Sequence, residues 1–170
     1  MVVLGVDPGF SVTGFACVQQ QQGVRIVDCG YLKMSPKDSL PTRVGQFYAL
    51  FEQKIADHKV THISLETSFL SKNPQTFLKL GFLRGVLYLL ADQHHLTIAE
   101  FAPREVKLAV TGFGGASKDQ VATMMMRVFP KLAEHGAVER EDMTDALAVA
   151  LCGVWSNQTE LQKLQARARG

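Results

Sequence analysis

Four carboxylates stand where a fold can bring them together. Asp7 ends an apolar run at the N-terminus, and Glu66 ends another short apolar segment. Asp142 and Asp145 are three residues apart in a helical pattern, so they share one helix face. Strands that run the same way place Asp7 and Glu66 side by side at one sheet edge, and the small residues of 146–150 allow the last helix to lie close to the sheet. We therefore expect the four carboxylates to converge.

Converging carboxylates repel one another unless a cation neutralises them. Hard divalent cations do this with oxygen ligands, and Mg²⁺ suits a set that contains no thiolate or imidazole cluster. Two such ions about 3.5–4 Å apart activate a water molecule and stabilise the departing 3′ oxygen of a phosphodiester. The carboxylates thus indicate metal-dependent hydrolysis of a phosphodiester.

Each acid also has a simpler interpretation when taken alone. Asp7 precedes Pro8-Gly9 and is a residue type that starts turns. Asp142 and Asp145 lie near the start of a helix, where negative charge is favourable. Glu66 closes an apolar strand and has no such local duty, so it is the hardest of the four to explain structurally.

The hydrophobic pattern predicts an α/β protein. The element order is β-β-β-α-β-α-β-α-α-α, which indicates a mixed sheet with helices packed on it. We expect one domain over residues 1–156 and a polar, flexible tail over 157–170. The predicted strands are at about 1–7, 12–19, 23–33, 60–66 and 96–101, and the predicted helices at about 41–58, 74–93, 103–111, 118–129 and 139–155.

Composition excludes several classes of protein. The chain has 170 residues, 46% of them hydrophobic, and a net charge of +2, which is typical of a globular protein and not of a disordered one. Three cysteines are too few and too scattered for a disulfide framework, which fits a reduced, cytoplasmic compartment. The N-terminus lacks the pattern of a signal peptide, and the longest uncharged apolar run, 146–155, is too short to span a membrane.

Basic residues gather in the middle of the chain, although the overall charge is nearly balanced. On charge alone the simpler interpretation is a solvated surface. The alternative is a face that binds a polyanion. The basic residues between positions 70 and 118 are Lys72, Lys79, Arg84, Arg104, Lys107 and Lys118.

Taken together, these motifs resemble the RuvC-type Holliday-junction resolvases of the RNase H-like superfamily over about residues 2–155. The Asp-Pro-Gly start alone is weak, because sugar-kinase-like ATPases share it, but the ordered combination is specific. The matching pieces are Gly5 to Gly9 with Thr13-Gly14-Phe15, Glu66, Asn73-Pro74, Leu78 to Gly81 with Arg84-Gly85, Ala102 to Lys107, Gly114 to Lys118 and Asp142 to Ala148.

The resemblance implies a mixed five-stranded sheet with helices on both faces. It also implies that all four carboxylates are catalytic metal ligands for Mg²⁺, with two ions per site and Mn²⁺ as a substitute. Lys107 and Lys118 match basic positions near the scissile phosphate, where they would stabilise negative charge. From the residues alone, a surface charge is the preferred interpretation for either lysine.

The resemblance also suggests which residues contact DNA. Phe69 matches an aromatic position beside the junction crossover, where stacking on an unpaired base is worth about 1–3 kcal/mol. A core phenylalanine is the alternative for this position. The expected DNA contacts are Phe69, Lys72, Asn73, Arg104, Lys107 and Lys118.

The implied activity is resolution of four-way DNA junctions by paired symmetric nicks, in recombination and repair, alongside the RuvA–RuvB branch-migration complex. Two strands must be cut, so a homodimer with two identical sites is expected. Helix 74–93 is apolar on nearly every side, which predicts burial on more than one side. With Gly81 and Gly85 it is the candidate interface, and a central core helix of a monomer is the alternative.

Three other functions are weaker interpretations. A YqgF-like nuclease of the same superfamily acts on RNA, but Phe69, Lys107 and the Asp142-x-x-Asp145 pair argue against it. A junction-binding module without cleavage gains nothing from four acids facing phosphates. An actin-like sugar kinase needs a second lobe for its nucleotide, and 170 residues leave no room for one.

Overall fold

The computed structural model describes residues 1–67, 74–130 and 141–168, with side chains as far as residue 157. The order of elements agrees with the prediction from the sequence. The elements are β1 (Val2–Asp7), β2 (Val12–Gln20), β3 (Val24–Lys33), α1 (Leu40–His58), β4 (His62–Glu66), α2 (Pro74–Gln93), β5 (Thr97–Phe101), α3 (Pro103–Thr111), α4 (Lys118–Val128) and α5 (Glu141–Ala168).

The five strands form one mixed sheet in the order β3-β2-β1-β4-β5. The first three strands are antiparallel neighbours, whereas β4 runs parallel to both β1 and β5. Val6 pairs with Leu65, so the last residues of the two strands, Asp7 and Glu66, lie at the same edge of the sheet. The predicted mixed sheet and the predicted proximity of these two strand ends are both confirmed.

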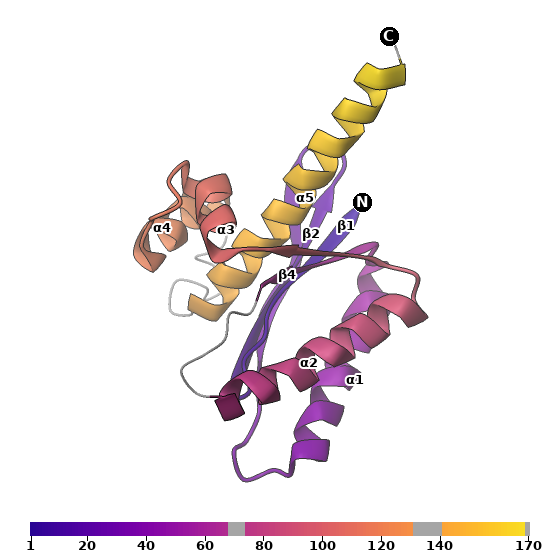
Figure 1. Cartoon of the computed structure of the whole chain (residues 1–170), viewed down its shortest axis with the longest axis vertical. Coiled ribbons are helices and arrows are strands. Elements are labelled where there is room, and N and C mark those ends of the chain that lie inside the picture. Colours follow the sequence, from indigo (N-terminus) through magenta and orange to yellow (C-terminus); the bar gives the residue numbers. More distant parts are fainter. Residues whose placement is uncertain (68–73, 131–140, 169–170) are drawn as a thin grey trace.

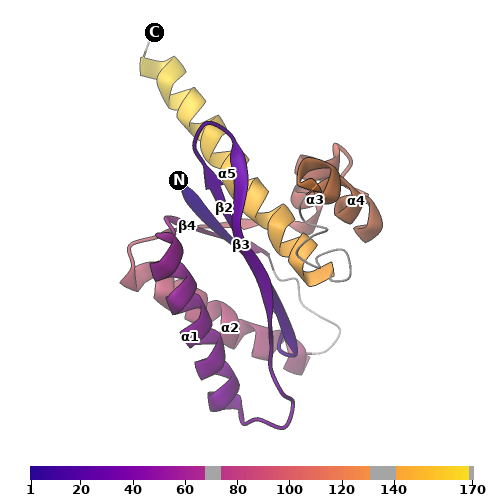
Figure 2. The ribbon, with the colours of Figure 1, turned by 180° about the vertical axis from the view of Figure 1, so that it is seen from behind.

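Helices cover both faces of the sheet, as predicted (Figures 1 and 2). Side chains alternate along a strand, so each strand contributes to two cores. Val3 and Ala16 pack in a core with α3, α4 and α5, while Leu4 and Phe15 pack in a second core with α1 and α2. The site-bearing strand β1 is therefore buried on both sides and held firmly.

Helix α5 lies against the sheet almost backbone to backbone. A Cβ added to Gly5 of β1 would lie 2.2 Å from the carbonyl oxygen of Ala146, and one added to Gly14 of β2 would lie 2.0 Å from that of Asp142. Ala150 also reaches Gly5, with its Cβ at 2.7 Å from the same added atom. The prediction that small residues let this helix approach the sheet is confirmed.

Helix α5 is longer than the sequence pattern indicates. It continues to Ala168, so the predicted helix end near residue 155 is wrong, and its C-terminal part projects beyond the sheet (Figure 1). Residues 154–168 contain neither glycine nor proline, and their glutamine, leucine, lysine and alanine residues favour helix without help from a core. The boundary at residue 156 stays a prediction.

Helix α2 buries only one side in the single chain. Leu83, Leu87 and Leu90 face the core, whereas Leu78 and Phe82 are largely exposed. The prediction of burial on more than one side is therefore wrong for this chain by itself. The other apolar side of α2 is left exposed.

Two expectations from composition can also be compared with the fold. Cys17 and Cys152 are buried and Cys29 is half-buried, and all three are free thiols. Within the described segments, no helix has the combined length and apolar character that crossing a bilayer requires.

The close seat of α5 yields a first prediction. Gly5→Ala should lower the free energy of unfolding by about 3 kcal/mol, because the new methyl overlaps backbone atoms that a side-chain rotation cannot clear. Gly45→Ala is the matched control, since Gly45 is exposed on α1 and an added Cβ meets nothing within 4 Å. Urea unfolding should show a gain of about 0.5–1 kcal/mol for this control. Equal effects in both variants would contradict the close contact.

Candidate active site

Side chains from the sheet edge and from three helices line one cavity of about 230 Å³. Asp7 and Glu66 come from the ends of β1 and β4, and Asp145 comes from α5. Two lysines, one from α3 and one from α4, complete its charged wall. The full lining is Asp7, Glu66, Pro103, Val106, Lys107, Lys118, Val121, Asp145 and Ala148.

Asp142 is close to this group without lining the cavity. It lies one turn before Asp145 on α5, and its backbone carbonyl faces Gly14. Its negative charge nevertheless acts on Asp7 and on Asp145. The structure thus brings three of the four predicted carboxylates into one cavity and places the fourth at its border.

The crowding of these acids changes their proton affinity. Burial, followed by the charges of Asp145, Glu66 and Asp142, raises the pKa of Asp7 from 3.8 to about 7. Burial and the charge of Asp145 also raise the pKa of Glu66. Burial likewise raises the pKa of Asp145, although Lys118 opposes the shift. The site holds more negative charge than its surroundings neutralise, so it favours a cation.

Lys118 supplies part of the missing positive charge. Its Nζ lies 3.2 Å from Oδ2 of Asp145 and 3.6 Å from Oε2 of Glu141. The charge of Asp145 raises the pKa of Lys118, which keeps the ammonium protonated. Ser117 and Gln120 form a capping box at the N-terminus of α4. The capping box fixes the start of the helix, and so the position of Lys118, its first residue. Glu141, which directly precedes Asp142, was not among the residues predicted for the site.

Lys107 approaches the cavity from α3. Its charge opposes the rise in the pKa of Glu66, so the ammonium faces that carboxylate across the cavity. The helix begins with Pro103 and a Glu105 side chain that accepts a 2.7 Å hydrogen bond from the Ala102 backbone. These signals place Lys107 in the second turn, toward the sheet edge.

The carboxylate set fits a hard divalent cation by its chemistry. All its donors are oxygen, which hard divalent cations prefer. Burial, and then the charges of neighbouring acids, raise the pKa of Asp7, so a bound cation would stabilise its ionised form. No three Asp, Glu, His or Cys side chains among the described residues are close enough to form a ready-made metal cage. Lys118 pairs with Asp145 and serves as a counter-charge.

The other predicted contacts have different outcomes. Phe69, Lys72 and Asn73 lie outside the described residues. Arg104 is exposed on α3 and does not line the cavity; its side chain lies over Gly114, where an added Cβ would meet Arg104 Cγ at 2.7 Å.

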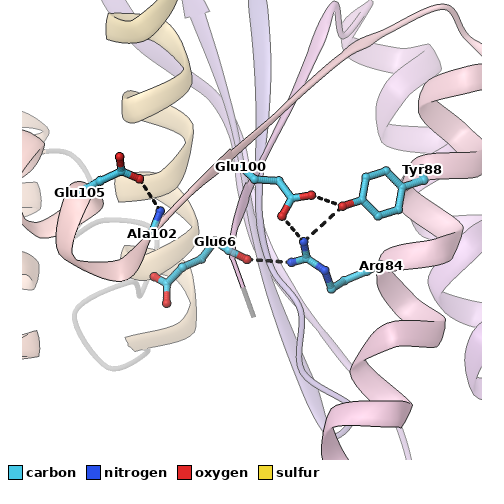
Figure 3. Close-up of polar contacts among 6 residues, drawn as sticks. All are labelled: Glu66, Arg84, Tyr88, Glu100, Ala102 and Glu105. Atoms are coloured by element: carbon cyan, nitrogen blue, oxygen red, sulfur yellow. Dashed lines mark hydrogen bonds and ion pairs between the residues drawn. The ribbon is translucent and has the colours of Figure 1, made fainter. Parts of the chain in front are cut away.

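Arg84 was counted among the basic residues of the chain, but the structure gives it a different position. Its Nη1 donates a 2.7 Å hydrogen bond to the backbone carbonyl of Glu66, and its Nη2 pairs with Glu100 (Figure 3). No local pattern reveals this arrangement, because the three residues belong to different elements.

A mixed five-stranded sheet, with acids at the ends of two adjacent parallel strands and on the helix that crosses them, defines an RNase H-like nuclease domain. A family profile described as "Crossover junction endodeoxyribonuclease RuvC" matches residues 3–153. The chain belongs to this RuvC family, whose members are metal-dependent nucleases, and it resolves Holliday junctions in DNA recombination and repair. The resemblance stated from the motifs is confirmed.

Individual relatives agree with this assignment. A RuvC protein of Pelodictyon phaeoclathratiforme is 46% identical over 89% of this chain and 78% of its own length. One from Chlorobium phaeobacteroides is 43% identical over 100% of this chain and 91% of its own length.

Solved structures show the same fold. Thermus thermophilus RuvC matches with a TM-score of 0.79 and 25% identity, over 94% of this chain and 97% of that one. Thermus thermophilus RuvC in complex with a Holliday junction substrate matches with a TM-score of 0.78 and 22% identity, over 94% and 96%.

The raised pKa of Asp7 predicts a pH-dependent gain in stability for Asp7→Asn. The pKa of Asp7 is about 7 in the folded protein and 3.8 in the unfolded chain. As the pH rises from 3.8 to about 7, the wild type therefore loses stability relative to the variant, which has no proton to release. In EDTA the variant should be more stable at pH 8, by about 1–4 kcal/mol, and no more stable near pH 4.

Urea unfolding across this pH range measures the difference. Asp57→Asn is the control, because Asp57 is exposed on α1 and does not line the cavity. A pH-independent effect of Asp7→Asn would show that the acids do not share a charged cavity.

Proposed function

We propose that Asp7, Glu66, Asp142 and Asp145 bind Mg²⁺, two ions per site, and that Mn²⁺ can replace it. The observation that carries this proposal is the single cavity shared by Asp7, Glu66 and Asp145 with two lysines. Carboxylates from β1, β4 and α5 meet there although they are far apart in the sequence, and nothing in the packing of a stable core requires it. When bound, the ions activate a water molecule and stabilise the departing 3′ oxygen.

The protein's own side chains orient the DNA strand for this reaction. Lys107 and Lys118 hold the scissile phosphate and stabilise the charge that develops on it. The Lys118 side chain is 63% exposed, so it can turn from Asp145 to a phosphate oxygen without unpacking α4. Hydrolysis leaves a 5′-phosphate and a 3′-hydroxyl, and two symmetric nicks across the crossover separate the junction into duplexes.

The exposed side of α2 is the proposed dimer interface. Leu78, Phe82, Gly85 and Leu89 recur at intervals of four, three and four residues, which places them along one helix stripe. Leu78 is 61% exposed, Phe82 42% and Leu89 49%, and a contiguous exposed apolar stripe is a common mark of a protein interface. A two-fold pairing on this stripe gives two identical sites for the two strands to be cut.

Further features follow from family membership alone. We infer that the enzyme works in the cytoplasm with the RuvA–RuvB branch-migration complex. Phe69, Lys72, Asn73 and Arg104 remain proposed DNA contacts, and exposed Arg104 is the one that the structure describes.

Asp7→Asn should abolish cleavage of a mobile four-way junction in Mg²⁺ while junction binding changes less than about threefold. The variant loses a metal ligand but keeps the DNA-binding surface. Lys107→Ala should slow single-turnover cleavage by about 10²–10³-fold and weaken binding much less, because its contact strengthens in the transition state.

The cleavage test runs beside linear duplex, an RNA–DNA hybrid and the surface control Lys37→Ala, which should cut the junction normally. Full cleavage by Asp7→Asn would disprove the catalytic assignment. A loss of affinity at an unchanged cleavage rate would make Lys107 a DNA anchor only.

Phe82→Glu should convert the dimer to a monomer, because it places a charge in the middle of the apolar stripe. Val128→Glu is the matched control, since Val128 is 45% exposed on α4, away from α2. Sedimentation velocity should show a monomer for the first variant and a dimer for the second, with both remaining folded. A dimeric Phe82→Glu protein would place the interface elsewhere.

A further inference from the structure

A nearly buried arginine connects α2 to the strand that carries Glu66. The Arg84 side chain is only 12% exposed, and its Nη1 donates to the Glu66 carbonyl oxygen at 2.7 Å. Its Nη2 contacts Glu100 of β5 and lies 3.3 Å from the hydroxyl of Tyr88, one turn further along α2 (Figure 3). The Tyr88 hydroxyl in turn donates to the second carboxylate oxygen of Glu100.

This carbonyl lies where the sheet stops supporting the chain. Pairing of β4 with β1 ends at Leu65, while pairing with β5 reaches Glu66, and the Thr67 amide donates to the Phe101 carbonyl at 2.8 Å. The backbone at Glu66 is thus held from the β5 side by the ladder and from the α2 side by Arg84. Together the two contacts restrict the peptide that follows Glu66, and so the direction of its side chain.

The guanidinium is itself held in place. A nearly buried arginine requires a counter-charge, and Glu100 supplies it. Tyr88 shares Glu100 with Arg84, so the three side chains form a closed network and not a single ion pair. Because the planar guanidinium reaches the carbonyl through one nitrogen and the carboxylate through another, lysine cannot reproduce both contacts.

We propose that Arg84, oriented by Glu100 and Tyr88, is a positioning residue that sets the direction of the Glu66 carboxylate in the cavity. The proposal rests on the proposed role of Glu66 as a metal ligand. The network also joins the site to the helix that carries the proposed dimer stripe, so Arg84 ties the cavity to α2 at the point where the acid leaves the sheet. The alternative is a purely structural tie that only stabilises the packing of α2 on the sheet.

Single-turnover cleavage of a four-way junction, with enzyme in excess, separates these roles. Arg84→Gln should lower the cleavage rate by 10–100-fold, with the junction Kd changed less than twofold, since misorientation of a ligand acts on chemistry and not on DNA affinity. Arg84→Lys should recover only part of the rate. Arg25→Gln is the control, because Arg25 is an exposed arginine on β3. This variant should cut the junction at the wild-type rate.

A second readout does not depend on cleavage. The rise in Tm on adding Mn²⁺ reports metal affinity, and Arg84→Gln should shift this titration to 10–100-fold higher metal concentration. Glu100→Gln and Tyr88→Phe should shift it in the same direction by less. If Arg84→Gln folds, the double variant Arg84→Gln with Glu100→Gln should be no worse than the more severe single variant. If Arg84→Gln fails to fold, Glu100→Gln and Tyr88→Phe decide the question.

Normal cleavage and normal Mn²⁺ titration in folded Arg84→Gln would overturn the inference, as would a lower Tm without metal as the sole effect. Glu66→Gln keeps failure of the inference distinct from failure of the proposed function. If Glu66→Gln cuts normally, the proposed role of Glu66 is wrong. If it is inactive while Arg84→Gln cuts normally, only the positioning role fails.

Discussion

The backbone contact between α5 and the first two strands is the constraint on which the rest of the molecule depends. Gly5 and Gly14 present no side chain, so the carbonyls of Ala146 and Asp142 lie almost on the sheet. Because the helix is this close, Asp145 lies near the end of β1, where Asp7 is the last residue. A larger residue at either glycine would move α5 outward, and the acids would no longer share a cavity.

The close approach of α5 also brings carboxylates together, which lowers the stability of the fold. Burial raises the pKa of Asp7 to about 7, and the repulsion of the neighbouring acids adds to this rise. Lys118 relieves part of it through Asp145, from an exposed position that leaves the ammonium able to move. Destabilised groups of this kind are common where proteins do chemistry. The two cores, on either face of β1, supply the rigidity that keeps this arrangement from relaxing.

The sequence predicted most of the fold and the main acids, because those depend on local signals. Apolar runs, turn residues and helical spacing located the strands and helices that the structure describes, and strand ends located Asp7 and Glu66. Local signals failed where the role of a residue depends on partners distant in the sequence or on a second chain. Helix α5 continues past residue 155 because nothing breaks it. The exposed stripe of α2 looks like core in a one-dimensional pattern. Arg84 was counted as a basic residue because its partners Glu66 and Glu100 lie 18 and 16 positions away.

The order in which the site residues occur along the chain has a consequence for synthesis. Asp7 and Glu66 lie in the first half of the chain, but Asp145 belongs to the last helix, which must dock before the cavity exists. Domains fold as units while they are made from the N-terminus. A nascent or truncated chain that lacks α5 therefore carries two of the acids without the cavity that they share with Asp145. The cavity therefore exists only in a chain whose α5 has been made and has docked on the sheet.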